Sequence, residues 1–211
     1  MDLFIKLGML VVFFGVTIAI GLVFGVLNGA MVAIMNLPPF IATLCTMLIT
    51  RGLGSILTGG MAVSWPSRSG QAGWFRNLFK IVNNGKIIPV GFLIVIVSII
   101  LMSIVLNKTR VGRYIIAIGS NKEAARLSGV NVIKYQMLAY IISGFFAGLA
   151  GIAYSATFSS SVAPGTGAGL ELDAIGGAII GGTSMTGGSG SIVGTLLGVF
   201  VMSLLKTGLP Y

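Results

Sequence analysis

Residues 107–134 read NKTRVGRYIIAIGSNKEAARLSGVNVIK and form a charged loop between long apolar runs. This charged loop holds six of the 13 basic residues of the chain and one acid, Glu123. Charges at this density must lie outside the hydrocarbon of a membrane, and an excess of Lys and Arg places a short loop on the cytoplasmic side. Within it, the segment from Glu123 to Gly129 suits a short docking helix for a soluble partner.

The composition indicates an integral membrane protein. Hydrophobic residues make up 55% of the 211 positions and charged residues 8%, and the mean hydropathy is +1.04. That leaves too little polar surface to cover a water-soluble globule. The formal charge of +9 is concentrated in loops without interleaved stacking aromatics, so it indicates membrane topology and not a nucleic-acid partner.

Two residue counts exclude further chemistry. The chain has no histidine, which excludes imidazole catalysis and histidine metal sites. Its one cysteine, Cys45, cannot form an intramolecular disulfide, and its apolar neighbours favour a packed thiol over a reactive one. We expect no catalytic residue, no metal site and no bound cofactor.

Four apolar runs are long enough to cross a bilayer core, which takes roughly 20 helical residues. They cover residues 7–35, 40–57, 87–106 and about 135–158. With the charged loop inside, the loop 61–86 lies outside, the Pro38-Pro39 turn lies inside, and the first span begins outside. Such a start favours further spans upstream, so we expect the sequence to be a fragment.

The chain changes character after residue 158. The apolar run 170–180 has only eleven residues, a glycine-rich stretch follows at 181–190, and residues 192–205 resume a helical pattern. Irregular backbone at membrane depth is tolerated where protein buries it or where it lines an aqueous cavity, and broken helices often mark substrate paths. A plain surface loop between two short spans stays an alternative. The expected fold is an all-α polytopic transmembrane helix bundle with a glycine-rich discontinuous segment, a single domain over 1–211.

Several of the 32 glycines recur every fourth residue, which places them on one helix face where backbones approach closely. We interpret them as packing residues, with a hinge or pore lining as the alternative. They are Gly21, Gly25 and Gly29; Gly144 and Gly148; and Gly190, Gly194 and Gly198.

Five polar residues in or beside the apolar segments are candidates for a substrate path: Asn28, Thr43, Arg51, Glu171 and Asp173. A charge such as Arg51 at the centre of a span costs roughly 2.5–3.5 kcal/mol, so it should face the bundle, face water or anchor at the interface. Glu171 and Asp173 have a structural alternative, because carboxylates stabilise a helix N-terminus.

Four stretches resemble the permease subunits of bacterial ABC importers for ribose and other simple sugars: residues 36–52, 112–132, 144–151 and 165–198. The resemblance implies a permease dimer of identical or related copies in the cytoplasmic membrane, an ATPase subunit that binds the ATP, and an extracytoplasmic sugar-binding protein. It also implies that Glu123, Ala124, Ala125, Arg126 and Gly129 form the helix that couples to the ATPase. Independently, the sequence holds no Walker A motif, so ATP-driven work needs a nucleotide-binding partner.

Complete permeases of that family carry further spans before residue 1 and after Tyr211, so the resemblance also implies truncation at both ends. The expected substrate is a monosaccharide, and a pentose on the resemblance alone. An intramembrane enzyme is disfavoured, because Glu171 and Asp173 stand two residues apart and point to different helix faces. An ion-coupled secondary transporter or a channel-like protein stays the alternative.

Overall fold

The computed structural model describes residues 2–64, 81–83, 86–88, 90–158 and 161–208. The chain divides into two compact units. The first comprises Met1–Ile94 and Gln136–Thr166, and the second comprises Val95–Tyr135 and Gly167–Tyr211. The fold is all-α and polytopic, as the sequence predicts, and the described residues include four helices long and apolar enough to cross a membrane.

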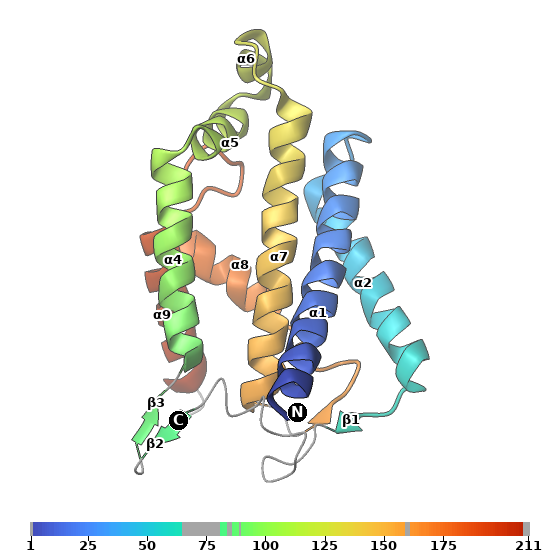
Figure 1. The fold of residues 1–211 in the computed structure, drawn as a ribbon. Coiled ribbons are helices and arrows are strands. Elements are labelled where there is room, and N and C mark those ends of the chain that lie inside the picture. Colours follow the sequence, from blue (N-terminus) through green and yellow to red (C-terminus); the bar gives the residue numbers. More distant parts are fainter. Residues whose placement is uncertain (1, 65–80, 84–85, 89, 159–160, 209–211) are drawn as a thin grey trace. The chain divides into compact units, whose positions relative to one another are not determined.

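The first unit is built on three long helices, α1 (Asp2–Ala33), α2 (Pro39–Thr58) and α7 (Val132–Phe158) (Figure 1). Helix α7 enters this unit at Gln136. Two short antiparallel strand pairs accompany the helices: β1 (Val63–Ser64) with β4 (Ser161–Val162), and β2 (Ile81–Asn83) with β3 (Lys86–Ile88).

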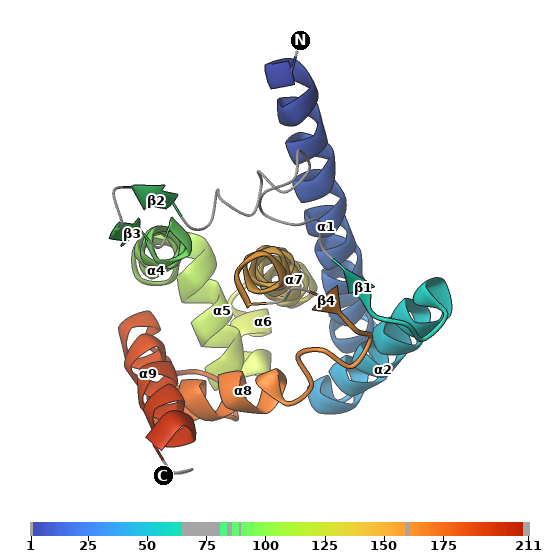
Figure 2. The same ribbon diagram turned by 90° about the horizontal axis from the view of Figure 1, so that it is seen from below.

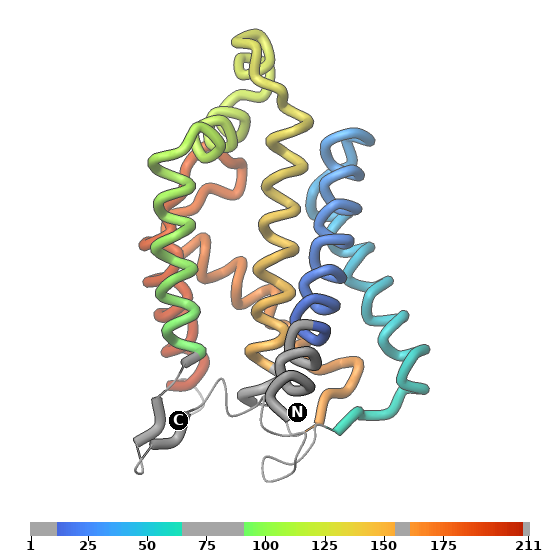
Figure 3. Tube along the Cα trace, viewed as in Figure 1, coloured from blue at the N-terminus to red at the C-terminus, as the bar shows by residue number. Residues whose placement is uncertain are grey.

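The second unit contains the other helices that the structure describes. Helix α4 (Val90–Lys108) enters it at Val95, and α5 (Arg110–Ser120), α6 (Lys122–Leu127), α8 (Leu170–Ile180) and α9 (Ile192–Gly208) follow. Figure 2 shows α8 and α9 side by side at the red end of the colour scale. The expected broken segment is confirmed in outline, since two helices flank a loop at 181–191 (Figure 3).

The breaks between the helices follow the expected local chemistry. Asn36 adopts a left-handed φ of 54°, and Pro39 opens α2, so the chain reverses between α1 and α2. Helix α2 ends at Thr58 and is capped by Gly59, which is left-handed at φ 61°, and Gly60 donates its N–H to Ser55 O at 2.8 Å.

Several boundaries differ from the sequence-based expectation: α1 covers Asp2–Ala33 and not 7–35, and two further differences have a visible local cause. The third span begins at Val90 and not at residue 87, because residues 86–88 pair with β2. Helix α7 begins at Val132, inside the expected loop, because the Asn131 side chain caps it by accepting from Lys134 N at 3.0 Å. The charged loop is itself mostly helical, since α5 and α6 occupy it.

Glycines hold α1 against α7 in the first unit. Gly21 and Gly25 face Gly144, and a Cβ built on Gly25 would lie 2.7 Å from the Tyr140 carbonyl oxygen. The two backbones therefore meet without side chains between them, as expected for membrane helix packing. In the second unit α8 and α9 meet in the same way, with Gly198 facing Gly177 and Gly194 facing Gly181.

Candidate functional site

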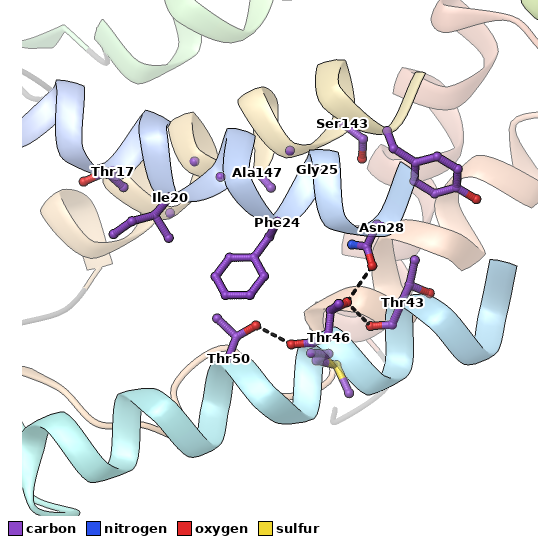
Figure 4. A pocket seen from close by; sticks show the side chains of 16 residues that line it. Thr17, Ile20, Phe24, Gly25, Asn28, Thr43, Thr46, Thr50, Ser143 and Ala147 are labelled. Carbon is purple, nitrogen blue, oxygen red and sulfur yellow. Dashed lines mark hydrogen bonds between the residues drawn. The ribbon is translucent and has the colours of Figure 1, made fainter. Parts of the chain in front are cut away.

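The site best supported by geometry is a pocket of about 420 Å³ between α1, α2 and α7, within the first unit (Figure 4). Its volume lies in the usual range of small-molecule sites, roughly 300–1,000 Å³. Seven lining residues carry hydroxyl or amide groups: Thr17, Asn28, Thr43, Thr46, Thr50, Tyr140 and Ser143. We call this the polar pocket.

Helical spacing explains why these residues converge. On α2, Thr43, Thr46 and Thr50 stand three and four residues apart, so they share one helix face. Figure 4 shows this threonine face turned toward Asn28 and Phe24 of α1. The pocket is also lined by the glycines at which α1 and α7 meet, Gly21, Gly25, Gly144 and Gly148. Because these residues have no side chain, they leave the space between the helices unfilled.

One hydrogen bond organises the polar groups. Thr46 Oγ1 donates to Asn28 Oδ1 at 2.8 Å, and Thr46 is only 7% exposed. The same hydroxyl lies 2.9 Å from Thr43 O, but its single proton serves one acceptor at a time. This contact fixes the side-chain amide of Asn28 beside the pocket.

Several polar groups of the pocket have no partner among the residues that the structure describes. They are the Asn28 amide nitrogen and the hydroxyls of Tyr140 and Ser143. Together they offer neutral donors and acceptors to a small molecule. No Asp, Glu, Lys or Arg occurs among the described residues that line the pocket.

A second pocket of about 650 Å³ adjoins the first, also within the first unit. It is lined by residues of α1, α2, α7, β1 and β4 and by the segment that follows β4, and it shares Thr17 and Gly151 with the polar pocket. A Cβ on Gly151 would meet no atom within 4 Å, so the shared border is open at that residue. We call this the outer pocket.

The structure brings together only two of the five candidate path residues, Asn28 and Thr43. Arg51 is half-buried on α2 and does not line the polar pocket. Glu171 and Asp173 belong to the second unit, where Glu171 Oε2 accepts from Gly169 N at 3.1 Å at the start of α8, the capping alternative. Asp173 forms an ion pair with Lys206 of α9.

Sequence reasoning missed the buried Thr46, although its place three residues after Thr43 was the available signal. It also missed the partner of Asp173. Lys206 stands 33 residues along the chain, and no local pattern joins the two.

The segment expected to couple to an ATPase forms the six-residue helix α6 with a defined cap at each end. Asn121 Oδ1 accepts from Ala124 N at 3.0 Å at its start. At its end Gly129 is left-handed at φ 79°, Gly129 N donates to Arg126 O at 3.0 Å, and Val130 N donates to Ala125 O at 3.1 Å. This pair of bonds defines a Schellman motif, which needs the glycine.

The faces of α6 differ in exposure. Glu123 and Arg126 form an ion pair of 3.0 Å, with side chains 69% and 70% exposed. Leu127 is 83% exposed, whereas Ala125 is 6% exposed and packs with Ile118 and Val132. Ala125 therefore positions the helix from beneath, and the outer surface presents Glu123, Ala124, Arg126 and Leu127.

The fold and the polar pocket are those of a polytopic membrane protein with a cavity of small-molecule size. Over residues 3–211 the chain matches the family described as branched-chain amino acid transport system / permease component, and it belongs to that family. No solved structure gave a significant match.

Several curated relatives of this chain are named as sugar import permeases. The chain is 39% identical over 196 residues to the ribose import permease protein RbsC of Escherichia coli (strain K12), covering 91% of this chain and 59% of that protein. It is 38% identical over 195 residues to the fructose import permease protein FruG of Bifidobacterium longum (90% and 56%). It is 36% identical over 196 residues to the galactose/methyl galactoside import permease protein MglC of Haemophilus influenzae (92% and 57%). The resemblance to sugar importer permeases is confirmed, and the chain spans less than two thirds of each relative.

Proposed function

We propose that this chain is a membrane-spanning part of an ATP-driven importer that carries a monosaccharide across the bacterial cytoplasmic membrane. The observation that carries the proposal is the polar pocket of about 420 Å³, where α1, α2 and α7 place neutral donors and acceptors among glycines and apolar side chains. The names of the relatives support a sugar. We favour a pentose, because ribose permeases are among the relatives with the highest identity.

The lining favours a neutral polyol over an amino acid, although the family description names branched-chain amino acids. An amino acid carries a carboxylate and an ammonium group, and burying either without a charged or strongly hydrogen-bonded partner is costly. No such charged side chain lines the polar pocket within the described residues. Sugar hydroxyls both donate and accept, which suits Asn28, Ser143 and Tyr140. The same lack of ionisable groups disfavours an ion-coupled mechanism.

The energy source in this proposal is a separate ATPase subunit that docks on α6. The chain holds no Walker A motif, and α6 presents an exposed, doubly capped surface with Glu123, Arg126 and Leu127. An extracytoplasmic binding protein would deliver the sugar, and a second permease copy, identical or related, would complete the path. The basic charged loop then lies on the cytoplasmic side.

The proposed cycle is alternating access, in which the sugar changes sides without chemical change. Shifting a two-state equilibrium from 1:99 to 99:1 takes about 5.5 kcal/mol of differential binding, which nucleotide and partner binding can supply. The sugar contacts themselves need only be weak, since a tightly held sugar would not be released.

Uptake by the complete transport complex in proteoliposomes tests the proposal. We expect labelled ribose to enter only with ATP and the binding protein, and excess galactose or leucine to compete weakly. Uptake that follows an imposed ion gradient without ATP would overturn the ATP-driven mechanism. ATP-dependent uptake of leucine with no sugar uptake would overturn the assignment of the substrate.

A further inference from the structure

A backbone contact joins α5 to the loop between α8 and α9, within the second unit. Gly119 and Ser120 end α5, and Gly187 and Gly188 lie in the loop at 181–191. A Cβ built on Gly187 would lie 3.0 Å from Gly119 Cα, and one built on Gly188 would lie 2.8 Å from Ser120 Cα. Ser120 Oγ also donates to Gly188 O at 3.4 Å. Figure 1 shows this loop rising from α8 and α9 to α5.

The contact requires glycine on both sides. Gly187 and Gly188 have φ values of 93° and 82°, which other residues rarely adopt. A Cβ on Gly119, whose φ is helical, would collide with the backbone nitrogen of Gly188. The backbone at the end of α5 therefore contacts the backbone of the loop directly, and a shift of this end of α5 must move the loop.

The loop is tied to the helices that it connects. It folds on itself through Ser184 N, which donates to Ser189 O at 3.0 Å, and Gly187 N, which donates to Ser184 O at 3.2 Å. At its base the hydroxyls of Thr183 and Thr195 lie 3.3 Å apart. A displacement of the loop tip therefore reaches α8 and α9.

On the other side, α5 is tied to α6. Only Asn121 separates the two helices, and Ile118 of α5 packs with Ala125 of α6 and Val132 of α7 in one buried cluster. The rings of Tyr114 and Tyr135 add an edge-to-face contact at 4.9 Å between centroids. Because α5 and α6 share this packed cluster, a displacement of α6 also displaces α5.

We propose that Gly119, Ser120, Gly187 and Gly188 form a joint that passes movement of α6 to the broken segment α8–α9. They act as positioning residues for transport and not as sugar ligands. The inference rests on the proposed function, in which α6 seats on an ATPase. It adds the element that receives the movement and the residues that transmit it.

The test is Gly119→Ala in the complete complex in proteoliposomes, with labelled ribose imported and ATP hydrolysed measured together. We expect normal insertion, normal co-purification of the ATPase and near-normal ATP hydrolysis, with sugar imported per ATP lower by about fivefold or more. The matched control is Gly208→Ala, at the end of α9, where a Cβ meets nothing within 4 Å. This control should leave the ratio unchanged.

A second variant keeps the test decisive if Gly119→Ala does not fold. Ser120 is exposed, so Ser120→Val should insert while crowding Gly188, and it should also lower import per ATP. If a folded variant imports as much sugar per ATP as the unaltered complex, the proposal that these residues transmit movement is wrong. Failure of the unaltered complex to import any sugar with ATP would instead overturn the proposed function.

Discussion

At the scale of single residues, the hydrogen bond between Thr46 and Asn28 decides how the polar pocket is presented. Asn28 uses its oxygen to accept from Thr46, which leaves its amide nitrogen available beside the pocket. A buried threonine on one helix thus orients an amide on another. Thr46 is a positioning residue, and Asn28 is the residue that we expect to contact sugar.

Replacing Thr46 with valine tests this assignment. Thr46→Val keeps the shape and removes the donor, and a lost hydrogen bond of about 0.5–1.5 kcal/mol corresponds to a KM for ribose about 2–10-fold higher. The maximal uptake rate should change little. Thr46→Ser restores the hydroxyl and should restore KM.

Thr207→Val is the matched control for this pair. Thr207 donates to Ser203 O at 2.8 Å within α9 and lies in the other unit, so the variant should leave KM unchanged. If Thr46→Val leaves the KM for ribose unaltered, the polar pocket does not lie on the sugar path.

At the scale of elements, hydropathy and break residues predicted the helices well. Apolar length fixed the four spans, and Pro38-Pro39 and Gly59-Gly60 fixed the ends of α2, because these signals are local. The segment at 170–180 formed α8 with the expected bounds.

The contacts of the site were not predictable in the same way. Thr46 with Asn28 and Asp173 with Lys206 join residues 18 and 33 positions apart, so only tertiary packing brings them together. Helix α5 was hidden in the charged loop because its basic residues masked a short amphipathic pattern, in which Ile118 is buried and Arg110 and Arg113 are exposed.

The α1–α7 contact gives a prediction at the same scale. Gly21→Ala places a Cβ against the Gly144 backbone, and overpacking of this kind costs typically 1–3 kcal/mol, so we expect a lower thermal unfolding temperature of the detergent-solubilised protein. Gly15→Ala lies on the same helix where a Cβ meets nothing within 4 Å, and it should leave the unfolding temperature unchanged. Equal behaviour of the two variants would show that the close α1–α7 contact does not form.

The end of α6 gives a second prediction for an element. Gly129 has open space around it, so Gly129→Ala acts only through the left-handed backbone, at a cost of about 1 kcal/mol. We expect a frayed α6 and roughly fivefold weaker binding of the ATPase, measured by titration in detergent. Gly129→Asn should bind more tightly than Gly129→Ala, because asparagine tolerates this conformation better. Equal affinities for all three forms would mean that α6 does not carry the docking surface.

At the scale of the whole molecule, the two units take different parts in the proposed transport. The first unit holds both pockets and the second holds the helix proposed to meet the ATPase, and the chain passes between the units at three places, 94–95, 135–136 and 166–167. The outer and polar pockets share Thr17 and Gly151, which makes their border the place where a sugar would pass from one to the other.

Cysteine labelling tests that passage. Cys45 is the only cysteine, so a Cys45→Ser background leaves each introduced thiol unique. Gly151→Cys should react with a polar, membrane-impermeant thiol reagent, and ribose with the binding protein present should slow the reaction severalfold, because the thiol stands at the border of the two pockets. Gly15→Cys is exposed on α1, lines neither pocket and belongs to a span that we place in lipid, so it should stay unlabelled. If ribose does not slow the labelling of Gly151→Cys, the two pockets do not lie on the sugar path. If both introduced thiols are labelled equally, the exposed face of α1 at residue 15 lies in water and not in the membrane.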